Sequence, residues 1–275
     1  MKKRNIKEFI LKYKIFIVGM LIWLIPLGFG SLMYLWWEPA EIIEEETVAE
    51  ANPGIDVQDT LILDNPDKAA GYAAATLVRL AVPDVSQPWS GSAVVWDQTQ
   101  EELIFVTSAH LLENVQGKLL VFFDREQYTE GTVLGVSEQA DIGFVSCRKS
   151  QVPVKILENL RYVSLHQRIY DSLTAGDLCV AVGCSTEDVA DRIQLLLFSA
   201  ADQKMEGVGE GLFLLDGNCQ AGMSGCGVFD GTGHFIGMVI AADGTRTLAV
   251  PMTRVNAAYT EITGNARDTR EYEKG

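Results

Sequence analysis

Three side chains in this sequence have the types and settings needed for nucleophilic attack on an acyl group. Ser224 lies between two glycines in the stretch AGMSGCGVFDGTGHFIGMV, residues 221–239. A serine hydroxyl attacks an amide when a base removes its proton, an acid orients that base and backbone N–H groups stabilise the oxyanion. His110 and Asp141 are the candidates for the base and the acid, and the order along the chain is His, Asp, Ser.

The positions of His110 and Asp141 next to apolar stretches suggest how they could meet. His110 follows LIFVTSA and precedes LLENV, so the end of a strand would hold its imidazole at the rim of a sheet. Asp141 begins the apolar stretch DIGFVSC, with no lysine or arginine close by in the sequence. A buried carboxylate needs a hydrogen-bond donor. An imidazole N–H would supply one and leave the other ring nitrogen free to accept the serine proton.

Each of these residues also has a purely structural interpretation. Ser224 alone fits a hydroxyl in a glycine-rich hairpin, because similar patterns are common outside active sites. His110 alone fits a hydrogen-bonded core histidine, and Asp141 alone fits a cap or turn residue. The combination of all three favours catalysis. The other two histidines, His166 and His234, are interpreted as surface or structural residues.

Five motifs, taken in order over residues 69–255, resemble those of the trypsin-like serine peptidases, specifically the HtrA/Deg type. They are SGSAVVW, FVTSAHLLENV, ADIGFV, GMSGCGVF and HFIGMVIAADGTRTLAVPMTRV. The resemblance implies His110 as general base, Asp141 as its orienting acid and Ser224 as nucleophile. It also implies that the backbone N–H groups of Gly222 and Ser224 form the oxyanion hole. Glycine at 222 would permit a turn conformation that larger residues disfavour.

Three features depart from the family pattern. Cys226 stands where the family usually has a second glycine, and Met223 replaces the usual polar residue before the serine. Either substitution could distort the oxyanion turn, which leaves an inactive or tightly regulated enzyme as an open alternative. The sequence after Val255 is too short for a PDZ domain, so none is expected.

The resemblance also locates the primary substrate pocket. In trypsin-like enzymes that prefer lysine or arginine, an aspartate lies at its base; the corresponding residue here is Asn218. The implied walls are Cys219, Gln220, Ala221, Ile240, Ala241 and Ala242. A cationic side chain would lose hydration there without meeting a buried carboxylate, whereas an aliphatic one gains about 25 cal/mol per Å² of buried area. We therefore expect cleavage after a small or medium apolar residue such as Val, Ala or Leu.

The elements that must position these residues are mostly strands. Short apolar runs separated by turn signals continue from Ala69 onward, which is typical of an all-β protein. We expect two packed antiparallel β-barrels of the trypsin-like type, with the site in the cleft between them. Helical signals are confined chiefly to LLENV and to a C-terminal helix starting near Thr253. The predicted peptidase domain spans residues 69–262, and a polar tail follows at 263–275.

The N-terminal part predicts a membrane anchor. The apolar run at residues 15–37 is long enough, at about 1.5 Å per residue, to cross a bilayer core of about 30 Å. Six lysines and arginines in residues 1–14 predict a cytoplasmic N-terminus, and an acidic extracytoplasmic linker is expected at 38–68. A cleaved signal peptide is the alternative. Its apolar core is usually about 7–15 residues, and the Ala-x-Ala at 49–51 lies far beyond the run.

The net charge and the cysteine content restrict the binding partners and metal sites that this chain could have. The net charge of −15 makes nucleic acid an unsuitable partner, because phosphates would repel such a chain. Five cysteines are an odd number, so at least one is unpaired within the chain, and their spacing favours buried thiols or one local bridge over a zinc site. No cofactor or metal is expected.

The sequence therefore predicts a membrane-anchored, extracytoplasmic serine endopeptidase that acts on polypeptides. A catalytically silent domain of the same fold, binding peptides or proteins at the cell surface, is the alternative.

Overall fold

The computed structural model of the 275-residue chain describes residues 65–82, 89–113, 115, 118–185, 188–206 and 209–269. The chain divides into two compact units, Met1–Asp56 and Val57–Gly275, and all described residues belong to the second. The predicted membrane helix at 15–37 and most of the predicted linker lie outside the described residues. Among the helices that are described, none is long and apolar enough to cross a membrane.

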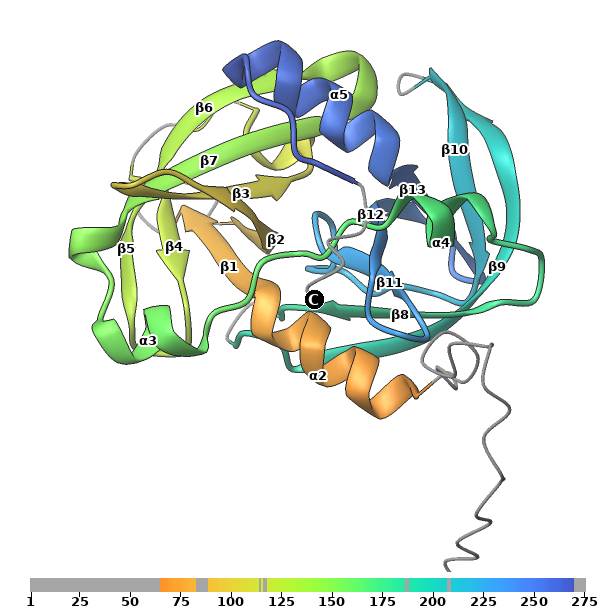
Figure 1. Cartoon of the computed structure of the whole chain (residues 1–275), viewed down its shortest axis with the longest axis horizontal. Coiled ribbons are helices and arrows are strands. Elements are labelled where there is room, and N and C mark those ends of the chain that lie inside the picture. The colour runs from red at the N-terminus through yellow and green to blue at the C-terminus, as the bar shows by residue number, and fades with distance from the viewer. Residues whose placement is uncertain are drawn as a thin grey trace, which may run out of the picture. The chain divides into compact units, whose positions relative to one another are not determined.

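The described chain is mostly β-structure (Figure 1). Its strands are β1 (Leu77–Val82), β2 (Trp89–Gln98), β3 (Glu102–Thr107), β4 (Leu120–Phe122), β5 (Tyr128–Glu130), β6 (Thr132–Ser137), β7 (Ile142–Arg148), β8 (Leu178–Gly183), β9 (Arg192–Met205), β10 (Gly209–Asp216), β11 (Gly227–Asp230), β12 (Phe235–Ala242) and β13 (Arg246–Pro251). Its α-helices are α2 (Pro66–Thr76), α3 (Val154–Asn159), α4 (Gln167–Asp171) and α5 (Met252–Thr263), and 3-10 turns occur at η2 (Ala109–Leu111), η3 (Glu138–Ala140) and η4 (Lys149–Gln151).

The first seven strands form one antiparallel sheet in the order β5-β4-β1-β2-β3-β7-β6. Side chains on a strand alternate between its two faces. In β2, Val94 and Trp96 belong to one hydrophobic core, whereas Ala93 and Val95 belong to another. Both faces of the central strands are therefore buried, which explains their almost continuous apolar runs.

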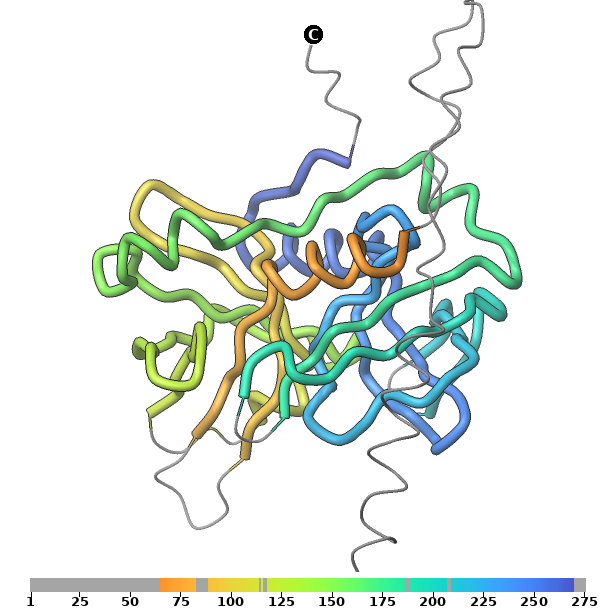
Figure 2. The backbone as a smooth tube through the Cα atoms, turned by 90° about the horizontal axis from the view of Figure 1, so that it is seen from below, coloured from red at the N-terminus to blue at the C-terminus, as the bar shows by residue number. Residues whose placement is uncertain are grey.

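The last six strands close into a barrel in the order β10-β13-β12-β11-β8-β9, because β9 pairs with both β8 and β10. The two strand systems lie side by side (Figure 2). Of the two predicted β-barrels, only the second is closed, and the first strand system is an open, curled sheet.

The first sheet is not closed by hydrogen bonds because its two edge strands follow each other directly in the chain. Only Gly131 separates β5 from β6, and a hairpin needs at least about two loop residues to bring strands side by side. Gly131 N–H donates to Leu119 O at 2.8 Å. A Cβ at 131 would approach Val121 Cγ2 to 2.9 Å, so a larger residue at this bend would force the Val121 side chain to shift.

Helix α2 had no helical signal in the sequence analysis and begins at Pro66, before the predicted domain start at 69. The side chain of Asn65 caps it by accepting from Lys68 N–H, and proline is favoured in the first turn because its missing N–H has no helical partner there. Its buried alanines, Ala69, Ala70 and Ala73, belong to the core that also contains β8. This small-residue face lets the helix lie close to the strand.

The C-terminal helix α5 contacts both strand systems. The Tyr259 ring lies 6.1 Å from Trp96 and 5.1 Å from Phe144, centroid to centroid, and its hydroxyl donates to Asp97 Oδ2 at 2.8 Å. Beyond the helix, the Arg267 guanidinium donates to two backbone carbonyls, Trp96 O at 2.6 Å and Val163 O at 2.9 Å. Part of the segment expected as a polar tail is therefore packed on the domain.

Candidate active site

His110 and Asp141 meet where two strands end. His110 lies in the 3-10 turn η2 after β3, and Asp141 lies between η3 and β7 with a left-handed backbone (φ 52°, ψ 43°). His110 Nδ1 is 2.8 Å from Asp141 Oδ2, and His110 N–H donates to Asp141 Oδ1 at 2.9 Å. Ala109 N–H donates to Asp141 O at 3.1 Å. Three contacts with Asp141, two to its carboxylate and one to its backbone oxygen, thus hold the two segments together.

This carboxylate controls the titration of the imidazole. The hydrogen bond to Asp141 raises the pKa of His110 above 6.5, partial burial opposes this effect, and the charges of Asp141 and Glu113 add to it. Because Asp141 accepts from Nδ1–H, the neutral ring keeps its Nε2 lone pair available. That tautomer is the one a general base requires.

Ser224 lies in a chain of two tight turns held by glycines. Met223 N–H donates to Gln220 O and Cys226 N–H donates to Met223 O, both at 3.0 Å. Gly222 (φ 93°) and Gly225 (φ 84°) each occupy the third position of one turn, where a positive φ is required. Within the part of the chain that the structure describes, the N–H groups of Gly222 and Ser224 donate to no acceptor.

Ser92, on β2 of the first sheet, ties this turn to the rest of the domain. Its N–H donates to Ser224 O at 3.0 Å, and its hydroxyl donates to Gly222 O at 2.8 Å. The same hydroxyl accepts from Cys184 N–H at 2.9 Å, at the end of β8. Thr107 Oγ1 donates to Ser92 O at 2.7 Å. One serine therefore fixes the carbonyls on both sides of Met223, a role that its place in the motif SGSAVVW did not reveal.

The segments that carry His110 and Ser224 share one backbone acceptor. Val239 O on β12 accepts from Gly225 N–H at 2.9 Å and from Ser108 Oγ at 3.2 Å. Gly225 follows Ser224 directly and Ser108 precedes His110 by two residues, so the two segments run next to each other. Among the described residues, the Ser224 hydroxyl itself has no hydrogen-bond partner. Catalytic hydrogen bonds are often long in a structure without substrate.

The two departures from the family pattern are both buried. The Met223 side chain packs beneath the turn against Gly183, and its sulfur accepts from Gln220 N–H at 3.3 Å. Cys226 is fully enclosed, and its carbonyl accepts from Val239 N–H at 2.9 Å. Both residues support the turn from below and leave its outer side, with Ser224, half-exposed.

None of the five cysteines forms a disulfide, and all of them are buried: Cys147, Cys179, Cys184, Cys219 and Cys226. Burial raises the pKa of Cys219 and of Cys184 to about 11 and that of Cys226 well above its ordinary value. The thiolate is the nucleophilic form of cysteine. These pKa shifts make a cysteine a poor nucleophile at this turn.

Two of the implied substrate-pocket residues, Cys219 and Ala242, lie next to a residue not anticipated from the sequence, Thr247. Its buried hydroxyl accepts from Cys219 N–H at 3.1 Å and donates to Gly217 O at 2.8 Å. Thr247 also pairs with Ala242 across β12 and β13, so residues 217–219 lie beside the end of β12.

The exposure of these seven residues differs. Cys219 and Ile240 are buried, Asn218 and Ala241 are half-buried, and Gln220, Ala221 and Ala242 are exposed. Gln220 accepts a hydrogen bond from the Arg192 guanidinium. Ala241 and Ala242 line a cavity of about 320 Å³ whose other walls come from β9, β10, β13 and Asp243. Their role as one pocket remains a prediction.

A second cavity, of about 520 Å³, lies beside the segment that carries His110. Its walls are Ala109, Leu112, Glu113, Val136 and Glu138, which come from both segments that meet at Asp141. The cavity therefore adjoins the turn that carries His110.

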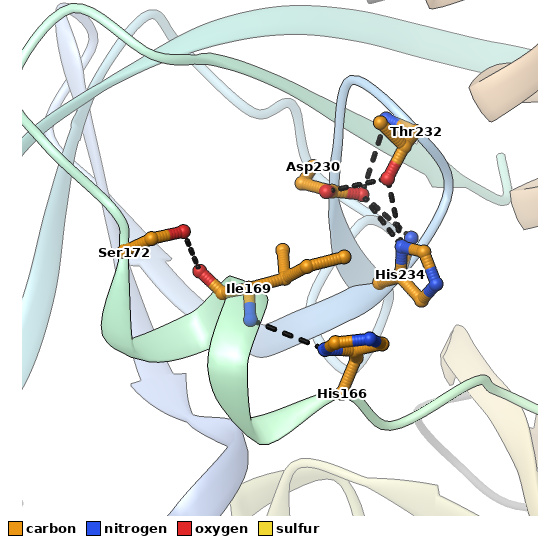
Figure 3. Close-up of polar contacts among 6 residues, drawn as sticks. All are labelled: His166, Ile169, Ser172, Asp230, Thr232 and His234. Atoms are coloured by element: carbon orange, nitrogen blue, oxygen red, sulfur yellow. Dashed lines mark hydrogen bonds and ion pairs between the residues drawn. The ribbon is translucent and has the colours of Figure 1, made fainter. Parts of the chain in front are cut away.

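The other two histidines have structural contacts (Figure 3). His166 Nδ1 accepts from Ile169 N–H at 3.2 Å and so caps α4. His234 closes a hairpin turn: its N–H donates to Asp230 Oδ1, and its Nδ1 is 2.7 Å from Thr232 Oγ1. The two rings touch edge to face, 5.1 Å apart.

These observations define a class of protein: a β-barrel packed beside a curled β-sheet, with a histidine–carboxylate pair next to a glycine-held serine turn. The chain belongs to the trypsin-like peptidase domain family, whose model matches residues 91–238, more than half of the chain. No curated protein sequence matches the chain at a significant level.

Solved structures of HtrA-type proteases share the fold. The HtrA-type protease AlgW with a tripeptide has a TM-score of 0.59 at 19% identity, covering 73% of this chain and 65% of that chain. AlgW with a decapeptide has a TM-score of 0.57 at 18% identity, covering 73% and 68%. Deg5 has a TM-score of 0.55 at 18% identity, covering 73% and 95%. This chain therefore spans slightly less than two thirds of the AlgW chain with tripeptide.

Proposed function

We propose that this protein is a serine endopeptidase in which His110, Asp141 and Ser224 form the catalytic triad. The observation that carries the proposal is the His110–Asp141 pair at 2.8 Å, held through Val239 beside a serine turn with two unengaged N–H groups. The family membership of the chain and the peptides bound in the AlgW structures support a polypeptide substrate.

The proposed reaction follows from the roles of these groups. Ser224 Oγ attacks the scissile carbonyl carbon while His110 Nε2 takes the hydroxyl proton, and Asp141 stabilises the resulting imidazolium. The N–H groups of Gly222 and Ser224 stabilise the oxyanion. His110 then gives the proton to the leaving amine, which leaves an acyl-enzyme. Water, deprotonated by His110, hydrolyses this ester and restores the serine hydroxyl.

The test of this assignment is Ser224→Ala. Hydrolysis of an unstructured protein substrate should fall to background, whereas the thermal midpoint of unfolding should stay nearly unchanged, because a half-exposed hydroxyl contributes little packing. Ser172→Ala, which changes an exposed serine on α4's C-terminal side, is the matched control and should keep full activity. Turnover of Ser224→Ala at the control rate would exclude the proposed mechanism.

For specificity, we propose a small or medium apolar residue on the acyl side of the cut bond. The absence of a carboxylate at Asn218 and the small or apolar character of Cys219, Ala221 and Ile240–Ala242 support this preference. A cleavage profile on an unstructured protein, measured by mass spectrometry, would test it. Predominant cutting after lysine or arginine would contradict this pocket assignment.

We further propose that the apolar run at residues 15–37 anchors the chain in the cell membrane, with the N-terminus cytoplasmic and the peptidase domain outside. The six basic residues before the run and the acidic stretch after it support this orientation. Protease added to intact cells should release a soluble fragment by cutting near residues 44–60. Release only after lysis would reverse the orientation.

A silent binding domain is the second candidate, and two observations favour it. The Ser224 hydroxyl has no hydrogen-bond partner among the described residues, and Met223 and Cys226 depart from the family pattern. A serine-directed fluorophosphonate probe separates the two functions. An active triad reacts covalently at Ser224, and a silent domain leaves that residue unlabelled.

A further inference from the structure

Three neighbouring outward-facing side chains of β9 form an exposed apolar ridge. Ile193, Leu195 and Leu197 are 61%, 51% and 46% exposed, whereas the alternating residues Leu196 and Phe198 point into the barrel. We call Ile193, Leu195 and Leu197 the β9 ridge. Contiguous apolar surface of this kind on a soluble domain usually marks an interaction site.

The ridge is exposed because the covering helix stops short of it. Leu195 and Ile193 lie directly opposite Val180 and Val182 of β8, so all four side chains point to the same face of the barrel. Val180 and Val182 are nonetheless buried in the core that includes the α2 alanines. Helix α2 therefore covers β8, and the same apolar face continues uncovered onto β9.

The chain enters α2 close to this ridge. Asn65 N–H donates to Gly231 O at 3.0 Å, and the preceding Asp230 pairs with Cys179, which in turn pairs with Leu196. Neighbouring strands are about 4.8 Å apart, so two strand spacings, about 10 Å, separate Asp230, which lies next to the entry point, from β9. An extended chain covers that distance in about three residues.

The residues immediately before this entry point match the ridge in character. Leu61, Ile62 and Leu63 form the longest apolar run of the otherwise acidic stretch 38–64. We propose that residues 61–63 dock on the β9 ridge, so that the segment before α2 covers the apolar face that the helix leaves exposed.

A cross-linking experiment on the full chain tests this placement. Ile62→Cys combined with Leu195→Cys should give an intramolecular cross-link with a short bismaleimide, identified by mass spectrometry at monomer mass. The native cysteines are buried and contribute little background. Ile62→Cys with Val154→Cys is the matched control, because Val154 is 70% exposed on α3 and lies outside the ridge.

Cross-linking of the 62/195 pair no greater than that of the control pair would overturn the proposal. A 62–195 or 195–195 link found only between two chains would also overturn it, because the ridge would then be covered by a second copy.

A double-mutant cycle gives an independent readout. Ile62→Ser and Leu195→Ser should each lower the thermal midpoint by about 2–4 °C, and the double variant should lose little more than either single variant. Val154→Ser should leave the midpoint nearly unchanged. Fully additive losses from the two changes would contradict a contact between the segment and the ridge.

Discussion

At the scale of single residues, two carboxylates on different sides set the protonation of His110. Asp141 bonds directly to Nδ1, and Glu113 acts through its charge from the neighbouring turn. Both stabilise the imidazolium, so the pKa of His110 lies above 6.5. The general base must be neutral, and activity should therefore be lost as the pH falls through this raised pKa and be recovered above it.

The first prediction tests the effect of the Glu113 charge on the pKa of His110. Glu113→Gln should move the acidic limb of the kcat/KM profile to lower pH, because one stabilising charge near the imidazolium is removed. Glu138→Gln, on the other wall of the same cavity, is the matched control, since the charges that raise the pKa of His110 are those of Asp141 and Glu113. Equal shifts in both variants would mean that the pH profile responds to the overall negative charge around the cavity and not to Glu113 in particular.

The second prediction concerns the orienting acid. Asp141→Asn keeps the size of the side chain but can donate to Nδ1, which stabilises the wrong tautomer of His110. Activity should fall on the order of 10⁴-fold, as for other triads altered in this way. Circular dichroism should show the folded domain. Activity within a few-fold of wild type would remove Asp141 from the mechanism.

At the scale of elements, the nucleophile turn is built against the first sheet at contact distance. A Cβ at Gly225 would lie 2.1 Å from Ser92 O and 2.4 Å from Thr107 Oγ1, and the backbone there has φ 84°. Only glycine allows β2, β3 and the turn to approach so closely. The absence of a side chain at Gly225 is therefore one reason why the two strand systems can pack together so closely.

The third prediction separates this close approach from simple backbone strain. Gly225→Ala should abolish activity and markedly lower the thermal midpoint, because the turn must move away from Ser92. Gly244→Ala is the control: its φ is 97° and its Cβ would meet nothing within 4 Å, so it should cost only about 1–2 kcal/mol of unfolding free energy. Similar losses in both variants would show that strain alone explains the effect.

At the scale of the whole molecule, the segment after α5 joins parts that are distant in the sequence. The Arg267 guanidinium donates to carbonyls of β2 and of residues 160–165, and Asn256 on α5 pairs with the backbone of Arg267 in both directions. Thr269 O accepts from Gln167 N–H at 3.0 Å. The segment thus closes the side of the domain where the two strand systems meet α5.

The fourth prediction concerns how much the hydrogen bonds of Arg267 stabilise the domain. Arg267→Ala removes the donor from two partly buried carbonyls, which costs about 1–3 kcal/mol for each group. The thermal midpoint should fall by roughly 4–8 °C for a total loss of about 2 kcal/mol. Lys204→Ala, which removes an exposed ion pair with Glu210, should change the midpoint little. An unchanged midpoint in Arg267→Ala would show that the segment does not stabilise the domain.

The sequence alone determined the mostly-β class and the residues that could do chemistry. Short apolar runs separated by turn signals predict the strands, and the glycine at 222 predicts a turn with a positive φ, which is 93° in the structure. Of the three histidines, His110 alone directly follows a strand-like apolar run, LIFVTSA. These signals are local, so they can be recognised without knowing which segments meet.

Tertiary structure decided which distant groups support those residues. The bonds of Ser92 to the nucleophile turn, of Thr247 to residues 217 and 219, and of Arg267 to Trp96 and Val163 all join segments far apart in the chain. A serine, a threonine or an arginine has the same local pattern whether or not it makes such a bond. The curl of the first sheet likewise depends on how β5 and β6 pack around Gly131. The packing of the whole fold decides which strands pair across a sheet, and the local sequence of each strand does not.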